Sequence, residues 1–255
     1  MAMKVSIITV CYNSSATIED TIKSVKSQTY KDIEYIIIDG GSTDNTNQII
    51  NNYSECVDIH ISESDEGLYD AMNKGIGMAT GDVVGILNSD DFFCTEHSVA
   101  DLISGFVSDD IDGVYSDLVY VQEKDTSKVT RLYSSKVYKQ SLIKFGLMLP
   151  HPTFYVKRSV YEKCGLYKTD YRVAADFELI ARCVSKGTKL NRVPKITVKM
   201  REGGISSSGL LWRVHQNAEI VRACRDNGIY TNIAMVALKL PYKIFTLLTR
   251  KFVSV

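Results

Sequence analysis

Residues 34–46 read EYIIIDGGSTDNT, and this stretch decides the class of fold. The apolar run within 34–38 has no polar residue in alternate positions, as a strand buried on both faces requires. It ends abruptly at Asp39-Gly40-Gly41-Ser42, where glycines and small polar residues favour a turn and the start of a helix. A buried strand, a polar turn and a helix form the repeating unit of a parallel α/β sheet.

The same unit occurs four times in the first 110 residues. Strands are expected at 5–10, 34–38, 57–62 and 82–87, and helices at 15–28, 44–53, 67–79 and around 99–106. This alternation predicts a parallel sheet covered by helices on both faces. Ligands bind beyond the carboxyl ends of the strands in such sheets, and the polar clusters of this chain follow its strands.

The second half is less regular. Strands are expected at 111–121, 129–133, 153–157 and 188–200, and helices at 174–186 and 208–228. No repeat or low-complexity linker separates the halves. We therefore expect an α/β domain over residues 3–205, with a mostly parallel, Rossmann-like sheet flanked by helices and halves at 3–110 and 111–205. A helical C-terminal extension would occupy 206–255.

Charge is unevenly distributed along this chain of 255 residues, although its net charge is zero. From Lys186 onward there are thirteen Lys and Arg against three acids, a surplus of ten, so the first 185 residues carry ten excess negative charges. The basic zone either faces phosphates or an anionic surface, or is a solvated basic face. Apolar content of 45% permits a sizeable core and excludes a disordered or fibrous chain.

Six scattered cysteines without a CxxC pair predict reduced thiols and a cytosolic compartment. The first apolar run is already a strand, so we expect no secretory leader. No uninterrupted apolar stretch reaches the roughly 18 residues that a membrane span needs.

The cluster Asn88-Ser89-Asp90-Asp91 follows the strand expected at 82–87. Two adjacent carboxylates at a buried strand end repel each other unless a positive charge lies beside them. A hard divalent cation that keeps waters and bridges phosphate oxygens fits such a turn. Helix capping by an aspartate is the structural alternative.

Two further acidic turns follow strands. Asp39 precedes paired glycines, which allow close approach of a ligand, and its carboxylate can accept from a ring N–H or ribose hydroxyls. A turn and helix cap would explain residues 41–44 equally well. In Asp65-Glu66-Gly67, the helix dipole accounts for Glu66, while Asp65 remains a ligand candidate at a strand end.

The second half carries weaker candidates. Asp176 and Glu178 lie near the start of a helix and point in different directions, so only one of them faces a given pocket. A carboxylate among apolar neighbours has the raised pKa that a general base needs, although an acid at a helix start is also common. His151 lies between two prolines, and Arg201 precedes Gly203-Gly204 in a loop that could hold a diphosphate.

Other catalytic motifs are excluded. The glycines of residues 75–81 (GIGMATG) end a helix and enter a strand, whereas a dinucleotide fingerprint must follow a strand and open a helix. The sequence has no Walker-type lysine loop, no His-Glu-x-x-His and no Gly-x-Ser-x-Gly.

Together the clusters resemble the family-2 inverting glycosyltransferases of the GT-A fold, over about residues 3–205. The matching blocks are residues 5–13 (VSIITVCYN), 36–46 (IIIDGGSTDNT), 65–76 (DEGLYDAMNKGI), 81–91 (GDVVGILNSDD) and 175–179 (ADFEL). The likeness is greatest to bacterial enzymes that build O-antigen, capsule or colanic-acid-type polysaccharides.

The resemblance implies roles for particular residues. Asp176 would be the general base, with Glu178 the alternative because Ala175 replaces the acid often found there. Asp91, assisted by Asp90, would hold Mg²⁺ or Mn²⁺, and His151 would lie near the acceptor or the phosphates. The residues expected to bind the nucleotide sugar are Thr9, Tyr12, Asn13, Asp39, Asp65, Lys74, Asn88, Ser89, Asp90 and Arg201.

The resemblance also implies an activity. A hexose or N-acetylhexosamine would move from a UDP-sugar to a hydroxyl of a lipid-pyrophosphate-linked saccharide, with inversion to a β-linkage. Residues 3–110 would bind the nucleotide sugar, and residues 111–205 the acceptor.

The acid-free stretch 233–255 resembles a basic amphipathic helix that lies in the surface of an anionic membrane. Pro241 interrupts this helix, and packing of the stretch on protein is the alternative. A peripheral enzyme on the inner face of the cytoplasmic membrane is expected, with no nucleic-acid partner; a homo-oligomer stays open.

Two other functions share some of these features. A sugar nucleotidylyltransferase needs a glycine-rich basic loop after its first strand, and Cys11-Tyr12-Asn13-Ser14 is neither glycine-rich nor basic. A non-catalytic glycosyltransferase-like subunit would have no need of acids at positions 39, 90, 91 and 176.

Overall fold

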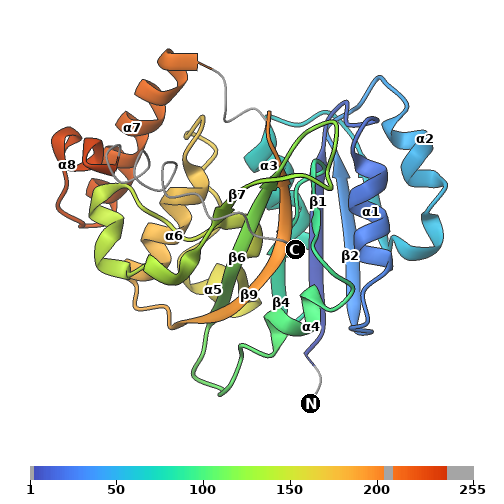
Figure 1. The fold of residues 1–255 in the computed structure, drawn as a ribbon, viewed down its shortest axis with the longest axis horizontal. Helices are drawn as coiled ribbons and strands as arrows, with labels where there is room; N and C mark the ends of the chain where they lie inside the picture. Colours follow the sequence, from blue (N-terminus) through green and yellow to red (C-terminus); the bar gives the residue numbers. More distant parts are fainter. Residues whose placement is uncertain (1–2, 204–208, 240–255) are drawn as a thin grey trace.

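A nine-stranded sheet runs through the computed structural model, which describes residues 3–203 and 209–239 (Figure 1). Its order is β3-β2-β1-β4-β8-β6-β9-β5, and β7 pairs only with β6. The strands are β1 (Val5–Cys11), β2 (Ile33–Asp39), β3 (Ile59–Ser62), β4 (Val83–Ile86), β5 (Asp91–Phe93), β6 (Gly113–Val121), β7 (Val129–Tyr133), β8 (Tyr155–Lys157) and β9 (Leu190–Arg201). Both halves of the chain therefore contribute to one sheet.

The first four strands are parallel, as the sequence predicts. Cys11 pairs with Asp39, and Asp39 with Ser62, so three strands end level with one another. This register brings the polar turns after β1, β2 and β3 together at the carboxyl edge of the sheet.

Helices cover both faces of this parallel part. Alternate strand residues pack to opposite sides: Ile37 lies in the cluster that contains α1, and Ile36 and Ile38 lie in the cluster that contains α3. The first-half helices are α1 (Ile18–Lys26), α2 (Thr46–Asn51), α3 (Leu68–Met78) and α4 (Ser98–Ile103), followed later by α5 (Arg158–Cys164) and α6 (Ala175–Ser185). Burial on both faces explains why these strands read as continuous apolar runs.

The later strands pair in both directions. β6 and β9 are parallel, whereas β8 is antiparallel to β4 and β6, β5 to β9, and β7 to β6. The seven residues 122–128 that join β6 to β7 are too few for the crossover that parallel strands require. Neither β5 nor α5 was predicted, because a three-residue strand and a seven-residue helix are too short to show a period.

The C-terminal helices share the core of the domain. α7 (Gly209–Asp226) packs on α6, and its residues Ile220, Ala223 and Cys224 lie in the same apolar cluster as Phe177. α8 (Ile233–Ala237) packs on the 3₁₀ segment η3 (Gln140–Phe145). The other 3₁₀ segments are η1 (Ser54–Cys56), η2 (Ser135–Val137) and η4 (His151–Thr153).

Within residues 3–203 and 209–239, no helix has both the length and the apolar character to cross a bilayer. Most of the predicted membrane-binding stretch, including Pro241, Lys243, Arg250 and Lys251, lies outside the described residues.

Gly85 in β4 makes a close contact that yields a stability prediction. It pairs with Tyr155, and a Cβ at position 85 would lie 2.1 Å from the Tyr155 ring. Because Tyr155 is fully buried, we expect Gly85→Ala to destabilise the fold by about 1–3 kcal/mol. Thermal unfolding should show Tm lower by roughly 2–4 °C per kcal/mol.

The double variant Gly85→Ala/Tyr155→Leu is the control. Removing the ring frees the space, so the two substitutions should destabilise by less than the sum of their separate effects. An unchanged Tm for Gly85→Ala would contradict this packing.

Candidate active site

Asp39 lies at the centre of the carboxyl edge. Its fully buried carboxylate accepts hydrogen bonds from Ser62 Oγ (2.6 Å), Asn47 Nδ2 (2.9 Å) and the backbone and side chain of Ser42. Burial raises the pKa of Asp39, but the hydrogen bonds from Ser42, Ser62 and Asn47 outweigh it and hold the pKa below its ordinary value. Asp39 is therefore an ionised carboxylate that holds together the turn after β2, helix α2 and the end of β3.

The turn after β1 is attached to the turn after β2 through Asn13. Its backbone N–H donates to Ser42 Oγ (2.7 Å), and its side-chain Oδ1 accepts from the backbone N–H of Thr43 (2.9 Å). Asn13 also has a positive φ of 50°, which asparagine tolerates better than most residues. Asn13 therefore shapes this edge rather than presenting a free side chain.

The predicted base-binding residues Tyr12 and Thr9 lie in opposite environments. The Tyr12 side chain is 62% exposed beside the Asp39 turn. Thr9 is fully buried, with its hydroxyl 3.1 Å from that of Tyr35. A nucleobase can reach the ring of Tyr12, but the side chain of Thr9 is not available to it.

Asp65 packs directly on the turn that follows Asp39. A Cβ on Gly40 would lie 2.4 Å from Asp65 Oδ2, so only glycine leaves room for this carboxylate. The other oxygen, Oδ1, accepts from Gly67 N–H (2.8 Å). Lys74, on the following helix, pairs with Glu63 (3.0 Å) and Asp70 (3.4 Å), so its ammonium already has anionic partners.

Asp91, in β5, is the most unusual acid of this edge. It is fully buried, and neither of its carboxylate oxygens has a hydrogen-bond partner among the described residues. The side-chain oxygen of Asn88 lacks a partner too. Burial, followed by the charge of Asp90, raises the pKa of Asp91 well above its ordinary value. An unsatisfied buried carboxylate is costly, and a ligand that binds it would remove the cost.

The turn 88–91 is firmly anchored on its other sides. Ser89 Oγ lies 2.9 Å from Ser14 Oγ, and Thr21 donates to the carbonyls of Ser89 (3.0 Å) and Asp91 (2.7 Å). Arg201 donates to the Asp90 carbonyl (2.8 Å) and pairs with Asp20. Arg201 thus holds the acidic turn in place with a guanidinium that is itself largely buried.

The acidic turn fits a hard divalent cation. Two adjacent carboxylates and an amide oxygen are the oxygen ligands that Mg²⁺ and Mn²⁺ accept, and the buried oxygens of Asp91 would give up no hydrogen bond to hold such an ion. In the part of the chain that the structure describes, no three His, Cys, Asp or Glu residues form a closed metal cage. A metal held here would need further oxygens from water or phosphate, as Mg²⁺ commonly does.

Asp176 lies at the start of α6 and is partly exposed. Its Oδ1 accepts from the Phe177 N–H (2.7 Å). Burial raises the pKa of Asp176, and nearby His151 opposes this shift. His151 itself is 8% exposed, with Nε2 2.7 Å from the hydroxyl of Tyr167, and its burial lowers its pKa. His151 is therefore a buried neighbour of Asp176, and its lowered pKa favours a neutral ring over a cation that could meet phosphates.

Glu178, the other acid of this helix, is enclosed by cations. It is fully buried and accepts from Arg182 (2.7 Å), Lys168 (3.1 Å) and Asn227 (3.1 Å). An acceptor hydroxyl cannot reach a carboxylate surrounded in this way. Of the two candidates for the base, Asp176 is the one whose side chain is partly exposed.

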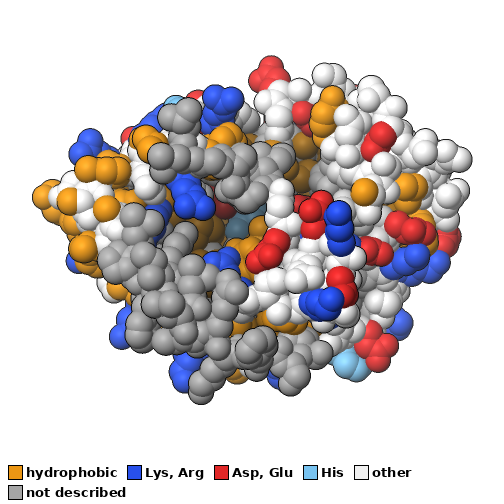
Figure 2. Space-filling model, turned by 45° about the horizontal axis from the view of Figure 1, so that its top comes forward, with side chains coloured by type: hydrophobic (Ala, Val, Ile, Leu, Met, Phe, Trp, Pro, Cys, Tyr) orange, Lys and Arg blue, Asp and Glu red, His pale blue; other side chains and the backbone are white. Residues whose placement is uncertain are grey.

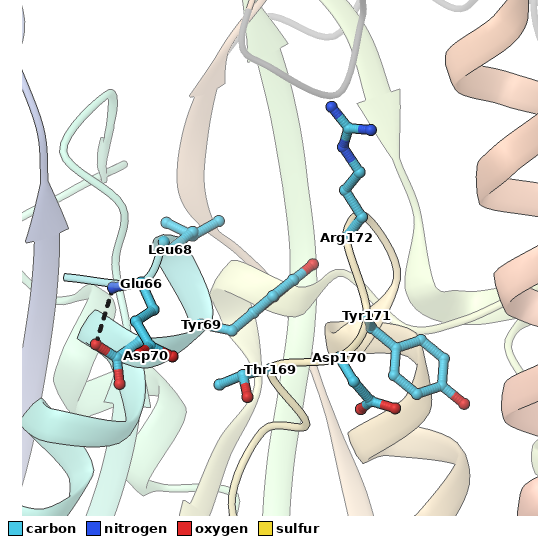
Figure 3. A pocket seen from close by; sticks show the side chains of 9 residues that line it. Glu66, Leu68, Tyr69, Asp70, Thr169, Asp170, Tyr171 and Arg172 are labelled. Atoms are coloured by element: carbon cyan, nitrogen blue, oxygen red, sulfur yellow. Dashed lines mark hydrogen bonds between the residues drawn. The ribbon is translucent and has the colours of Figure 1, made fainter.

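A cavity of about 310 Å³ lies between residues 66–70 and residues 169–172 (Figure 3). Tyr69 extends from α3 across it, and its hydroxyl donates to the Val173 carbonyl (2.9 Å), three residues before Asp176. Figure 2, with the upper edge of Figure 1 brought forward, shows acidic side chains close to a hollow in this face. The sequence did not single out Tyr69 or the 169–172 segment, because their meeting is a long-range contact.

The family of the chain follows from comparison with known proteins. The model of "Glycosyl transferase family 2" matches residues 6–165, more than half of the chain. This chain belongs to glycosyl transferase family 2 and is a nucleotide-sugar-dependent glycosyltransferase. The resemblance recognised in the sequence is thereby confirmed.

Two curated relatives agree. A PGL/p-HBAD biosynthesis glycosyltransferase of Mycobacterium bovis is 29% identical over 211 residues, covering 80% of this chain and 79% of the relative. An uncharacterized glycosyltransferase of Mycobacterium tuberculosis is 34% identical over 185 residues, covering 71% of this chain and 69% of the relative.

Solved structures confirm the GT-A fold. S. aureus TarS 1–349 in complex with UDP-GlcNAc has a TM-score of 0.71 at 17% identity, with 93% of this chain and 72% of that chain covered. Mannosyltransferase PcManGT from Pyrobaculum calidifontis, in complex with GDP-Man and Mn²⁺, has a TM-score of 0.69 at 18% identity, covering 97% of this chain and 74% of that chain.

The unpartnered oxygens of Asp91 lead to a stability prediction. Because burial holds the pKa of Asp91 above its unfolded value, the carboxyl group destabilises the metal-free fold increasingly as pH rises above about 4. We therefore expect metal-free Asp91→Asn to be more stable at pH 7 by about 1 kcal/mol, with Tm roughly 2–4 °C higher.

Thermal unfolding with EDTA and with Mn²⁺ checks this prediction. Mn²⁺ should raise the Tm of the wild type but not that of Asp91→Asn. Asp101→Asn, at a partly exposed position in the first turn of α4, serves as the control and should respond to Mn²⁺ like the wild type. A lower metal-free Tm for Asp91→Asn would mean that the carboxylate has a partner.

Proposed function

We propose that this enzyme transfers a hexose or N-acetylhexosamine from a UDP-sugar to a hydroxyl of a lipid-linked saccharide, with inversion to a β-linkage. The reaction would serve the synthesis of a bacterial surface polysaccharide such as O-antigen or capsule. The observation that carries the proposal is Asp176: a partly exposed carboxyl with a raised pKa at the start of α6, three residues after the Val173 carbonyl that Tyr69 of the cavity contacts.

The donor would lie along the carboxyl edge of β1, β2 and β4. Tyr12 offers a ring for stacking on the nucleobase, and Asp65 would contact the nucleoside, whereas the fully buried Asp39 would act by ordering the turn beside it. Asn13, Ser89 and Arg201 would keep these turns in position. Neighbours of this fold carry either UDP-GlcNAc or GDP-Man, so the choice of UDP rests on the family resemblance.

Asp91 and Asp90 would hold Mg²⁺ or Mn²⁺, with Asn88 adjacent. Such an ion, when bound, neutralises charge on the departing diphosphate. The structural neighbour PcManGT was solved in complex with Mn²⁺, which supports metal use.

Asp176 would act as the general base. Its carboxylate removes the proton of the acceptor hydroxyl while that oxygen forms a bond to the anomeric carbon. The bond between this carbon and the diphosphate oxygen breaks on the opposite side, and the electron pair leaves with the nucleoside diphosphate. A single displacement of this kind inverts the anomeric configuration. A pKa raised towards neutrality suits a base that must receive a proton in the reaction.

The acceptor saccharide would enter the cavity between residues 66–70 and 169–172. Tyr69 supplies an aromatic surface there, and the carboxylate of Glu66 and hydroxyl of Thr169 are available for sugar hydroxyls. Membership of glycosyl transferase family 2 removes the nucleotidylyltransferase alternative. A non-catalytic subunit remains the competing function, and turnover distinguishes it.

Nucleotide release tests the proposal directly. The protein is incubated with UDP- and GDP-sugars, with Mn²⁺ or EDTA, and with or without a lipid-pyrophosphate-linked sugar. We expect UDP release that needs metal and increases with the acceptor. Asp176→Asn should reduce turnover by about 10²–10⁴-fold without weakening UDP binding. The wild-type rate should fall on acidification, with a midpoint above the ordinary aspartate pKa of about 3.9, because only ionised Asp176 accepts the proton.

Glu178→Gln is the matched control for the base. It removes the charged partner of Arg182 and leaves Lys168 with its longer contact to Asp226 (3.7 Å), so Tm should fall, while the folded fraction keeps its turnover within a few-fold. If Glu178→Gln lost turnover and Asp176→Asn retained it, the assignment of the base would be wrong. UDP binding without turnover on any acceptor would favour the non-catalytic subunit.

A bulky side chain at the cavity mouth tests the acceptor site. Leu68 is 45% exposed, and Leu68→Trp should fill part of the cavity. We expect the KM for the acceptor to rise at least about tenfold, equivalent to about 1.4 kcal/mol, while the Kd for UDP stays unchanged. Val107→Trp, at a 72% exposed site after α4, should leave the acceptor KM unchanged. Equal KM values for the two variants would place the acceptor elsewhere.

A lipid-linked acceptor would be anchored in the membrane, so the enzyme would act at its cytoplasmic face. The basic and acid-free composition of residues 233–255 supports peripheral attachment to anionic lipid.

A further inference from the structure

Two acid-free parts of the sequence meet in the fold. Residues 126–161 contain no Asp or Glu, and neither do residues 227–255. Thr231 donates to the Lys144 carbonyl (2.5 Å), and a Cβ on Gly146 would lie 3.2 Å from Val236 of α8. Figure 1 shows α8 and the η2–η3 segment on the same side of the molecule, away from β1–β3. The fold thus joins regions distant in sequence into one surface without carboxylates of its own.

The outer face of α8 is apolar. Val236 is buried against the core, whereas Ile233 and Leu238 are 58% and 60% exposed and Ala234 and Ala237 are also exposed. Just before the helix, Tyr230 is 79% exposed. A helix on a protein surface normally turns polar residues outward, so an apolar outer face indicates an interaction site.

Exposed lysines lie on the η2–η3 segment, whose η3 part packs on α8. Lys136, Lys139 and Lys144 are exposed and form no ion pair with the described residues. Lys144 lies beside the ring of Phe145, 5.3 Å from its centroid. The neighbouring acid Asp226 is already matched by Lys168 and Arg222. The surface therefore combines exposed apolar groups with a net positive charge.

We propose that this surface, formed by Tyr230, Ile233, Leu238, Lys136, Lys139 and Lys144, rests on an anionic lipid bilayer. Apolar side chains would enter the headgroup region, and the lysines would meet lipid phosphates. A second copy of the chain is a poorer occupant, because it would bring the same cations together without acids to match them. Residues 240–255 have the same kind of composition: they contain three cations, Lys243, Arg250 and Lys251, and no acid. The choice of lipid rests on the proposed function, which supplies a lipid-linked acceptor.

Vesicle co-sedimentation of the full chain tests the proposal without donor or acceptor. We expect binding to phosphatidylcholine vesicles containing phosphatidylglycerol, much weaker binding to phosphatidylcholine alone, and loss of binding at high salt. The Leu238→Glu variant should bind at least about tenfold more weakly, since it places a charge in the apolar face. Val107→Glu, at a still more exposed apolar site elsewhere (72% against 60% for Leu238), should bind like the wild type.

Two triple variants with the same change in net charge test the role of the lysines. The triple variant Lys136→Glu/Lys139→Glu/Lys144→Glu should lose at least about tenfold in binding. The triple variant Lys31→Glu/Lys124→Glu/Lys163→Glu, at exposed lysines outside this surface, should lose clearly less. The Kd for UDP confirms that each variant is folded.

Equal binding by the surface variants and their controls would overturn the proposal. So would a concentration-dependent dimer, seen by sedimentation velocity and abolished by Leu238→Glu, in a protein that ignores vesicles. A protein that binds vesicles through this surface but transfers no sugar would refute the proposed function alone.

Discussion

The carboxylate of Asp39 is the group on which the carboxyl edge of the sheet depends. A buried negative charge is tolerated only when the protein replaces its water, and here the donors come from the turn after β2, from α2 and from the end of β3. Meeting that requirement fixes the Ser42 turn, which in turn receives Asn13 from the end of β1. One desolvated charge thus sets the relative positions of three loops that arise from separate strands.

Asp91 represents the opposite condition at the same edge. Asp39 has all its hydrogen bonds and a lowered pKa, whereas Asp91 has none and a raised pKa. Arg201 donates to the neighbouring carbonyl of Asp90, and its charge offsets only part of the effect of burial on Asp91. A carboxylate without hydrogen-bond partners beside a rigid turn lowers the stability of the fold, and a bound ligand would supply the missing partners. Binding sites commonly reduce stability in this way.

The sequence predicted the parallel half of the fold well, because each of its strands is buried on both faces and ends at a polar turn. It also placed Asp39, Asp65 and Asp91 at one edge, since parallel strands bring their carboxyl ends together. It could not separate Asp176 from Glu178, because Glu178 acquires Lys168 and Asn227 as partners only through tertiary contacts. Likewise, the burial of His151 and Thr9 depends on packing partners far away in the sequence.

The same kind of distant contact connects the C-terminal helices to the proposed base. Glu219 of α7 accepts backbone N–H groups from Arg172 (2.8 Å), Val173 (2.9 Å) and Ala174 (2.9 Å), directly before Asp176. These residues also adjoin the cavity proposed for the acceptor. A charged carboxylate that satisfies three consecutive donors cannot move without breaking several bonds at once, so α7 and the start of α6 behave as a single unit. The helix that leads to the proposed lipid-facing surface is therefore also the helix that positions the base, and a lipid-held acceptor and Asp176 would share one rigid frame.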